Sequence, residues 1–399
     1  MSFQMSAGQI QLAGRFNDFP AYPLADVPGI KRDLLARGVD VIDLGAGDAD
    51  LAPPPAAIAA LTDAVARPAM SRYPFQLGLP AFREAVSGWM GRRFGVTVDP
   101  YREVLPLIGS KEGIAHLALV YVGAGDATVF PDPGYLPYLG GTLLAGGMPH
   151  AVALRPENDF LVPLEDIPED VARRTRILYL NYPNNPTAAI APRAYLQDAV
   201  NWCRERGAIL AYDNAYSEIA FDGYRPPSIL EFDGAMDVAV EFHSMSKTYN
   251  MTGWRIGWAA GNPDAIAGLS RVKSFVDTGQ FLPVQAAAAA ALESYDAWVP
   301  GNVAAFRDRR DALVAALNDA GIPASSPRAT MYLWVPVPGG LSEPFARRAL
   351  MEEGVVIMPG AALGAGGEGF FRAALTQPAD RLREAAQRLA RLLEGTGST

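Results

Sequence analysis

The sequence has little cysteine and no long apolar run, and each absence excludes a class of protein. Its one cysteine, Cys203, cannot form an internal disulfide, and the surrounding AVNWCRERG predicts an inert thiol on a helix that ends at a glycine. No run of about 18 apolar residues without charge occurs, and the first residues show no basic stretch leading into an apolar run. We therefore expect a cytoplasmic protein that does not cross a membrane.

Positive charge and histidine are also scarce. The chain has 34 Lys and Arg against 43 Asp and Glu, which gives a net charge of −9. Nucleic-acid backbones and anionic membranes bind clustered positive charge, so neither is an expected partner. The three histidines, His116, His150 and His243, are far apart in the sequence and none has a metal-ligand spacing. No metal site is expected, and structural roles are expected for these side chains.

The chain is long enough for two domains, since 399 residues exceed the usual size of one core and half of them are hydrophobic. From about residue 103 to 261, short β-rich runs alternate with longer helical stretches, which predicts an α/β fold with a mostly parallel sheet covered by helices. Because open α/β sheets bind ligands where their strands end, the polar residues at these ends predict a site. The runs are EVLPLIGS, ATVFPDPGY, RILYLNYPNNP, AILAYDNAY, DVAVEFHSMSKT and RIGWAAG.

A second domain is predicted from the change of pattern after the β-rich region. Residues 286–320 are rich in alanine and helical in character. Beyond them, MYLWVPV and GVVIMPG predict strands, and REAAQRLARLLEG predicts an amphipathic helix. We expect residues 1–48 to form an N-terminal arm and part of a small domain, residues 49–290 to form a large domain, and residues 291–399 to form the small α+β domain.

A lysine between small hydroxyl residues is the most informative feature. SMSKTYNMTGWRIG, residues 244–257, places Lys247 after the apolar strand DVAVEFHS. At a strand end a lysine is partly desolvated, which lowers the pKa of its amine and favours an imine with a carbonyl compound. Ser244, Ser246 and Arg255 add hydroxyls and a permanent guanidinium, which suit a phosphate dianion. An isolated lysine is usually a solvated surface charge, so the interpretation depends on these neighbours.

A carboxylate and a phenol follow another apolar strand. In AILAYDNAYSE, Asp213 ends the strand and Tyr216 comes three residues later. In isolation this pattern is typical of an aspartate that caps a helix and a tyrosine that packs. Beside a pyridine ring, however, a buried carboxylate would keep the ring nitrogen protonated and make the ring an electron sink for amino-acid carbanions. Tyr216 could then hydrogen-bond the ring phenolate.

Three further strand ends carry weaker signals. Asn185, in the turn LNYPNNPTA, could donate its amide to a ring oxygen or could form a simple Asx turn. Gly109 and Ser110, in LIGSKEGIAHLA, open a helix whose free N–H groups could hold a phosphate. Tyr135, in FPDPGYLPY, offers an aromatic face for stacking on a flat ring, although most tyrosines only fill space.

These pieces, in this order and spacing, resemble the class I and II aminotransferases of fold-type I, which depend on pyridoxal 5′-phosphate, and the resemblance runs over most of the chain. It implies that the large domain binds this cofactor and has a mostly parallel seven-stranded sheet flanked by helices. It implies that Lys247 forms the imine and shuttles the proton. Asp213 is implied at the pyridine nitrogen. The other implied cofactor contacts are Tyr216 and Asn185 at the ring oxygen, Tyr135 on the ring, and Ser110, Lys111, Ser244, Ser246 and Arg255 around the phosphate.

The resemblance also concerns the substrate and a second subunit. Arg372, in FFRAALTQ, matches the arginine that holds the substrate α-carboxylate with two parallel hydrogen bonds. Asn185, Gly47 and Tyr135 are implied beside the substrate. Tyr73, in RYPFQLG, matches the tyrosine that reaches the phosphate of the neighbouring subunit. A homodimer with shared active sites is therefore implied, which moves an amino group between an L-amino acid and a 2-oxo acid, with 2-oxoglutarate as the expected acceptor.

Within the family, several segments look most like the LL-diaminopimelate aminotransferases of lysine biosynthesis, namely IDLGAGDADL, IGSKEGIAH, GTLLAGG, NYPNNPTAA and FHSMSKTYNMTGWRIG. That substrate carries a distal ammonium and carboxylate, so its pocket should contain an acidic or amide partner. The stretch after Tyr73 reads PFQLGLP and has no acidic residue, which leaves Gln76 as the polar candidate. An aminotransferase for alanine, aspartate or an apolar or aromatic amino acid is the alternative.

Three other classes of protein fit the sequence less well. A lyase or synthase on the same fold remains open, because the same carbanion can eliminate a β-substituent. A non-enzymatic regulator is disfavoured because all the named catalytic positions are filled. A nucleotide-binding enzyme is disfavoured because the glycine-rich AALGAGGEG, residues 361–369, lacks the strand-to-helix setting of a phosphate loop, and we expect a flexible loop there.

Overall fold

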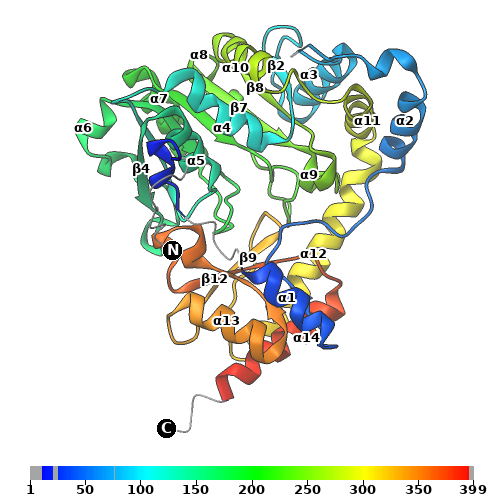
Figure 1. The fold of residues 1–399 in the computed structure, drawn as a ribbon, viewed down its shortest axis with the longest axis vertical. Coiled ribbons are helices and arrows are strands. Elements are labelled where there is room, and N and C mark those ends of the chain that lie inside the picture. Colours follow the sequence, from blue (N-terminus) through cyan, green and yellow to red (C-terminus); the bar gives the residue numbers. More distant parts are fainter. Residues whose placement is uncertain (1–10, 21–25, 76, 395–399) are drawn as a thin grey trace.

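The computed structural model describes residues 11–20, 26–75 and 77–394. Figure 1 shows one body of helices around a large sheet, and a second body that contains strands β9 and β12 and helices α13 and α14. The long helix α12 runs from the first body to the second. Within the described ranges, every helix is too short or too polar to span a lipid bilayer.

The large sheet has seven strands and confirms the predicted α/β fold class. Its order is β2-β8-β7-β6-β5-β3-β4, and only β8 runs antiparallel to its neighbours. Each of the six runs predicted from the sequence contributes a strand, whereas the edge strand β4 was not among them. The strands are β2 (Val104–Leu107), β3 (Ala127–Asp132), β4 (Met148–Ala153), β5 (Thr175–Leu180), β6 (Ile209–Asp213), β7 (Ala239–Ser244) and β8 (Gly257–Gly261).

The two faces of this sheet bury two separate hydrophobic clusters, because successive side chains on a strand point to opposite faces. On β5, Ile177 and Tyr179 pack with side chains of helices α4 and α10. Leu178 and Leu180 pack on the other face with side chains of helix α7, including the buried Cys203. Burial of both faces explains why these strands are continuous hydrophobic runs in the sequence.

Helices cover the sheet and build the rest of the chain. Helix α14 confirms the predicted amphipathic helix, since Leu382, Ala385 and Leu389 bury one face against the second body. The helices are α1 (Val27–Ala36), α2 (Pro55–Val65), α3 (Pro80–Phe94), α4 (Ser110–Tyr121), α5 (Pro137–Ala145), α6 (Glu169–Ala172), α7 (Arg193–Arg206), α8 (Ala235–Val238), α9 (Met245–Thr248), α10 (Pro263–Val276), α11 (Leu282–Glu293), α12 (Tyr295–Asp319), α13 (Ser342–Glu353) and α14 (Ala379–Glu394).

Two small sheets form the second body. An antiparallel sheet has the order β11-β12-β9, and β1 pairs in parallel with β10. The predicted strands MYLWVPV and GVVIMPG are present, whereas β12, which carries Arg372, was not predicted as an element of this sheet. The strands are β1 (Ile42–Asp43), β9 (Tyr332–Pro336), β10 (Val355–Val356), β11 (Met358–Pro359) and β12 (Phe370–Ala374).

The predicted division into domains can be compared with the structure at two points along the chain. The boundary after residue 290 falls inside the continuous helix α11, so the division into domains stays a prediction. In the N-terminal part, β1 pairs with β10 of the second body, and Leu34 of α1 packs against Leu350 and Val356. The described residues of this arm therefore contact the second body.

The expectation of a flexible loop at residues 361–369 is wrong. The segment forms two 3-10 turns that dock on the end of β3. The Gly366 N–H donates to the Asp132 carboxylate (3.1 Å), and the Gly134 N–H donates to the Leu363 carbonyl (2.9 Å). A Cβ on Gly366 would lie 2.3 Å from the Asp132 carbonyl oxygen, so glycine allows this contact. The glycines serve close packing between the two bodies.

Candidate active site

A cavity of about 610 Å³ lies between the seven-stranded sheet and the β11-β12-β9 sheet. Residues that follow the carboxyl ends of β2, β3, β5, β6 and β7 line it from one side, and residues of β9 and β12 line it from the other. Twelve of the residues singled out in the sequence meet here. They are Gly47, Ser110, Lys111, Tyr135, Asn185, Asp213, Tyr216, Ser244, Ser246, Lys247, Arg255 and Arg372.

Lys247 lies on the short helix α9, directly after β7. The Ser246 N–H donates to the Ser244 hydroxyl (3.2 Å), which caps this helix and fixes the turn out of the strand. The Lys247 ammonium donates to the Gly47 carbonyl, which comes from the N-terminal part of the chain. The amine therefore reaches the cavity from the side of the seven-stranded sheet. It contacts the segment around Gly47, which closes the cavity on the opposite side.

Asp213 is a buried carboxylate with one oxygen engaged and one free. Its Oδ2 accepts a hydrogen bond from the Tyr138 hydroxyl (2.9 Å), whereas Oδ1 has no partner although it is buried. Burial raises the pKa of Asp213 to about 6, and the Tyr138 hydroxyl and the Ala215 N–H oppose this rise. An unpartnered carboxylate oxygen at a cavity wall is suited to a cationic N–H group of a ligand.

Burial of the ionised Asp213 carboxylate lowers the stability of the ligand-free protein. Because the folded-state pKa of about 6 lies above the ordinary 3.8, the folded state binds more protons between these values, and stability falls as pH rises through this window. We expect Asp213→Asn to raise the free energy of unfolding at pH 7 by on the order of 3 kcal/mol. Urea denaturation of the ligand-free protein at pH 7 and pH 4.5 measures this difference. It should shrink at the lower pH, and an equal difference at both values would contradict the assignment.

The predicted phosphate-binding end lies at the start of helix α4. The helix begins at Ser110, and Gly109 before it has a φ of 71°, which glycine adopts without strain. A Cβ on Gly109 would lie 2.5 Å from an Arg255 guanidinium nitrogen, so this guanidinium lies directly beside the start of the helix. The free N–H groups of the helix start, the guanidinium and the hydroxyls of Ser110, Ser244 and Ser246 together form a cradle for a dianion.

Arg372 faces the cavity from the second body. One guanidinium nitrogen donates to the Asn185 side-chain oxygen (2.7 Å) and another donates to the Gly45 carbonyl (2.7 Å). The buried Nε has no partner, and the guanidinium lies 4.2 Å from the centre of the Tyr332 ring. The side chain is therefore fixed in orientation and keeps its positive charge for an anionic group in the cavity.

The sequence interpretation missed two tyrosines of the site. Tyr138 donates to Asp213 and its ring stacks on Tyr179 with 4.9 Å between ring centres. It lies three residues after Tyr135 in FPDPGYLPY, in the first turn of α5, and its closeness to the end of β3 was a usable signal. Tyr332 lines the cavity at the start of β9, where MYLWVPV was interpreted only as a strand.

One residue from the predicted list lies elsewhere. Tyr73 is not in the cavity of this chain and is 73% exposed, beside the 65% exposed Phe75. Gln76 lies outside the described residues. His243, which adjoins the lysine strand, does not line the cavity; it pairs with the buried Glu241 (2.7 Å) and stacks on Trp258. This packing agrees with the structural role expected from the sequence.

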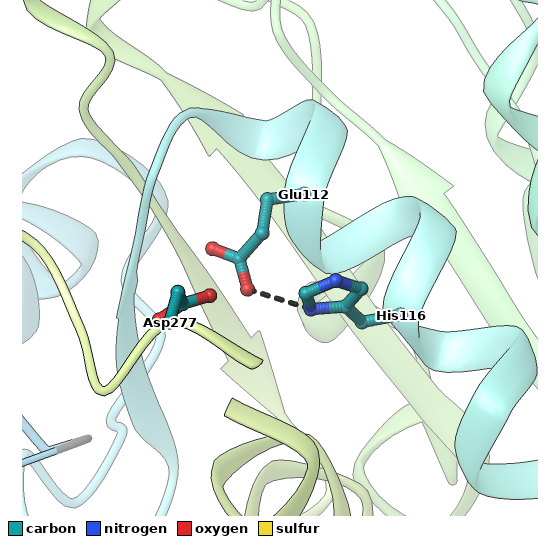
Figure 2. Close-up of side chains that lie close together, drawn as sticks. All are labelled: Glu112, His116 and Asp277. Carbon is teal, nitrogen blue, oxygen red and sulfur yellow. Dashed lines mark ion pairs between the residues drawn. The ribbon is translucent and has the colours of Figure 1, made fainter. Parts of the chain in front are cut away.

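A second cluster of polar groups lies on the outer side of helix α4. Figure 2 shows Glu112 and His116 of α4 beside Asp277, with the imidazole paired to the Glu112 carboxylate (2.9 Å). The ligand atoms of these three side chains lie within 4.8 Å of one another, a spacing that could hold a metal ion. However, the fully buried Lys273 ammonium already lies 2.9 Å from both carboxylates. The lysine supplies the positive charge, so we interpret the cluster as a buried ion-pair network.

This network makes a prediction about stability. Removing the charge of the fully buried Lys273 leaves Asp277 without a counter-ion and Glu112 with His116 alone. We expect Lys273→Met to lower the free energy of unfolding by about 3–5 kcal/mol. Chemical denaturation measures the change, and the exposed Arg271→Met on the same helix should stay within about 0.5 kcal/mol of the parent. Equal stability of the two variants would contradict the role of Lys273.

Comparison with known proteins identifies the class that this fold and site define. A family model described as aminotransferase class I and II matches residues 39–389. The chain therefore belongs to the class I and II aminotransferase family. The chain has the fold of the fold-type I aminotransferases, with a mostly parallel central sheet. A solved structure described as an aminotransferase from Staphylococcus aureus has a TM-score of 0.88 at 31% identity, with 96% of this chain and 99% of that chain covered.

Relatives within the family carry more specific names. A protein of Desulforudis audaxviator named LL-diaminopimelate aminotransferase is 51% identical and covers 94% of this chain and 96% of its own length. A protein of Nitratidesulfovibrio vulgaris with the same name is 48% identical, with 96% and 99% covered. A structure from Thermus thermophilus, described as a probable N-succinyldiaminopimelate aminotransferase, has a TM-score of 0.86 at 39% identity, with 92% and 98% covered.

Proposed function

We propose that this aminotransferase binds pyridoxal 5′-phosphate on Lys247 and moves an amino group from LL-diaminopimelate to 2-oxoglutarate. One observation carries the proposal: Lys247, the half-paired Asp213 and the fixed Arg372 converge on a single cavity. These groups supply an amine, a buried carboxylate and a carboxylate-binding fork. A transamination site on a pyridine cofactor needs all three.

The residues present fit this cofactor. The cradle of Gly109, Ser110 and Arg255 suits its phosphate, and the free Asp213 Oδ1 suits its protonated pyridine nitrogen. Tyr216 and Asn185 line the cavity, where they can hydrogen-bond a ring oxygen. When bound, pyridoxal phosphate supplies an electron sink that stabilises a carbanion at the amino acid Cα.

The chain's own residues bind and orient the substrate and move its Cα proton. The two-pronged Arg372 holds the substrate α-carboxylate and so fixes the direction of the Cα–H bond. The Lys247 amine, which follows strand β7 into the cavity, would be the base that takes up and gives back the Cα proton. Both half-reactions use the same groups, because the second reverses the first with a 2-oxo acid.

The choice of LL-diaminopimelate rests on the remaining charges of the cavity and on the names of the relatives. Once Lys247, Asp213, Arg255 and Arg372 have their roles, and Lys111 is left to the cofactor as the resemblance implies, two charged lining residues remain, Lys31 and Asp43. They are partly exposed and pair with each other (2.6 Å). A second zwitterionic end on the substrate offers a carboxylate to Lys31 and an ammonium to Asp43, whereas an apolar donor offers neither.

We also propose a homodimer with shared sites. Large apolar side chains are exposed on two segments that lie side by side, since the Leu79 N–H donates to the Gln285 side chain (2.6 Å). Exposed apolar side chains grouped in this way favour an interface with a second copy. Tyr73 would then reach the phosphate end of the neighbouring site. The exposed side chains are Tyr73, Phe75, Leu77, Phe275, Val276 and Phe281.

Steady-state kinetics with a panel of amino donors tests the substrate. With 2-oxoglutarate as acceptor, kcat/KM for LL-diaminopimelate should exceed kcat/KM for alanine, aspartate and phenylalanine by at least about 100-fold, because only this donor offers both an ammonium and a carboxylate to the Lys31–Asp43 pair. A higher value for any of the three would keep the aminotransferase and discard the lysine-pathway role.

A further inference from the structure

Tyr332 is a buried phenol of the cavity for which neither the motifs nor the family comparison supplies a role. It opens strand β9 and is 3% exposed. Charged and titratable groups reach it from three other elements: Lys247 on α9, Arg372 on β12 and Tyr216 after β6. It therefore contacts both the carboxylate-binding end of the site and the ring-oxygen end.

The ring of Tyr332 supports the guanidinium of Arg372. The guanidinium carbon lies 4.2 Å from the ring centre, within the range of a cation–π contact. The Arg372 side chain is itself buried, so this contact is poorly screened by water. Asn185 and Gly45 accept hydrogen bonds from two of the guanidinium nitrogens and set their directions, while the ring sets the plane.

The hydroxyl of Tyr332 faces Tyr216. In the structure the Tyr216 hydroxyl donates to the Tyr332 oxygen (3.4 Å), and either hydroxyl can turn to donate or accept. Burial raises the pKa of Tyr332, but the positive charges of Lys247 and Arg372 and the hydrogen bond from Tyr216 outweigh it, and the pKa lies below its ordinary value. A more acidic phenol is a better donor. A Cβ on Gly47 would lie 1.9 Å from the Tyr332 oxygen, so the phenol reaches this position only beside glycine.

We propose that Tyr332 is a positioning residue with two separable parts: its ring holds Arg372 for the substrate carboxylate, and its hydroxyl donates to Tyr216 once Tyr216 has turned its own hydrogen toward the bound cofactor. Tyr216, with its oxygen so occupied, is a stronger donor to the ring oxygen of the cofactor, because hydrogen bonds in a chain polarise one another. The inference rests on the proposed function. It predicts that the two parts can be removed one at a time.

Tyr332→Phe removes the hydroxyl alone. A pH titration of the cofactor's absorption in the loaded protein should show the pKa of the Lys247–cofactor linkage raised by about 0.5–1 unit, because Tyr216 then stabilises the deprotonated form less. The KM for the amino donor should stay within about twofold, since the ring remains. Tyr195→Phe is the matched control, because it removes the hydroxyl of a half-buried tyrosine that donates to the Val162 carbonyl outside the cavity. It should move neither quantity.

Tyr332→Leu removes the ring as well. The KM for the amino donor and the dissociation constant of glutarate, a non-reacting dicarboxylate, should both rise about tenfold above the values for Tyr332→Phe. Tyr332→Met serves if the leucine variant does not fold. A linkage pKa in Tyr332→Phe within about 0.2 units of the parent, or equal KM values for the phenylalanine and leucine variants, overturns the proposal. Failure of the parent protein to transaminate at all would instead overturn the proposed function.

Discussion

Lys247→Arg is expected to lower the rate of transamination by at least about 10⁴-fold, the largest loss that any single substitution in this chain should cause. Arginine keeps the positive charge beside the Gly47 carbonyl but stays protonated, so it can neither bond the cofactor's aldehyde nor accept the Cα proton. The loss should appear in kcat, measured with saturating donor and acceptor, because Arg372 and the cradle are unchanged.

Reductive labelling separates loss of chemistry from loss of folding. The loaded protein is treated with borohydride, and peptide mapping then identifies the lysine that carries the cofactor. The chain has four lysines, so only four attachment sites need to be distinguished. We expect the cofactor on the peptide that contains Lys247 in the parent and on no peptide of Lys247→Arg. Label on a different lysine, or a variant that retains more than about 1% of the parent kcat, would contradict the role of Lys247. The four lysines are Lys31, Lys111, Lys247 and Lys273.

Arg372→Leu is expected to lower kcat/KM for every amino donor by about 10²–10⁴-fold. The variant loses two charge-assisted hydrogen bonds to the α-carboxylate, and each is worth about 1.5–3 kcal/mol. Arg372→Lys should recover only part of the loss, because a point charge replaces a planar fork. Cofactor binding should be unchanged, since Arg372 lies at the opposite end from the phosphate cradle.

The exposed Arg347→Leu is the matched control for this substitution. Its ion pair with Asp26 spans 3.5 Å between two largely exposed side chains and contributes little. Its kcat/KM should equal that of the parent. If Arg372→Leu lowers kcat/KM for the apolar phenylalanine but not for charged donors, Arg372 binds something other than the α-carboxylate.

The sequence predicted most of the central sheet and most of the cavity for one physical reason. Strands buried on both faces are hydrophobic runs, and the polar residue that ends each run marks the carboxyl edge. Asp213, Asn185 and Lys247 each follow such a run, so their convergence could be inferred before any contact was known. The strand β4, by contrast, lies at the sheet edge and its residues are largely half-exposed, which leaves no continuous hydrophobic signal.

Residues that act through long-range contacts could not be inferred in this way. Tyr332 meets Tyr216 across 116 positions of sequence, and Arg372 meets Asn185 across 187. Nothing local to MYLWVPV distinguishes a strand tyrosine that fills space from one that supports a guanidinium. The glycines of residues 361–369 were interpreted as flexible for the same reason, because their close contact with Asp132 joins distant segments.

The most direct test of the central claim is the half-reaction of the cofactor-loaded protein with one amino acid and no 2-oxo acid. The absorption of the bound cofactor should disappear within a single turnover when LL-diaminopimelate is added, and should return when 2-oxoglutarate follows. Absorption that persists with diaminopimelate, glutamate, alanine, aspartate and phenylalanine alike would contradict the account. Continuous release of ammonia and pyruvate from a β-substituted amino acid without any oxo acid would assign the site to a lyase instead.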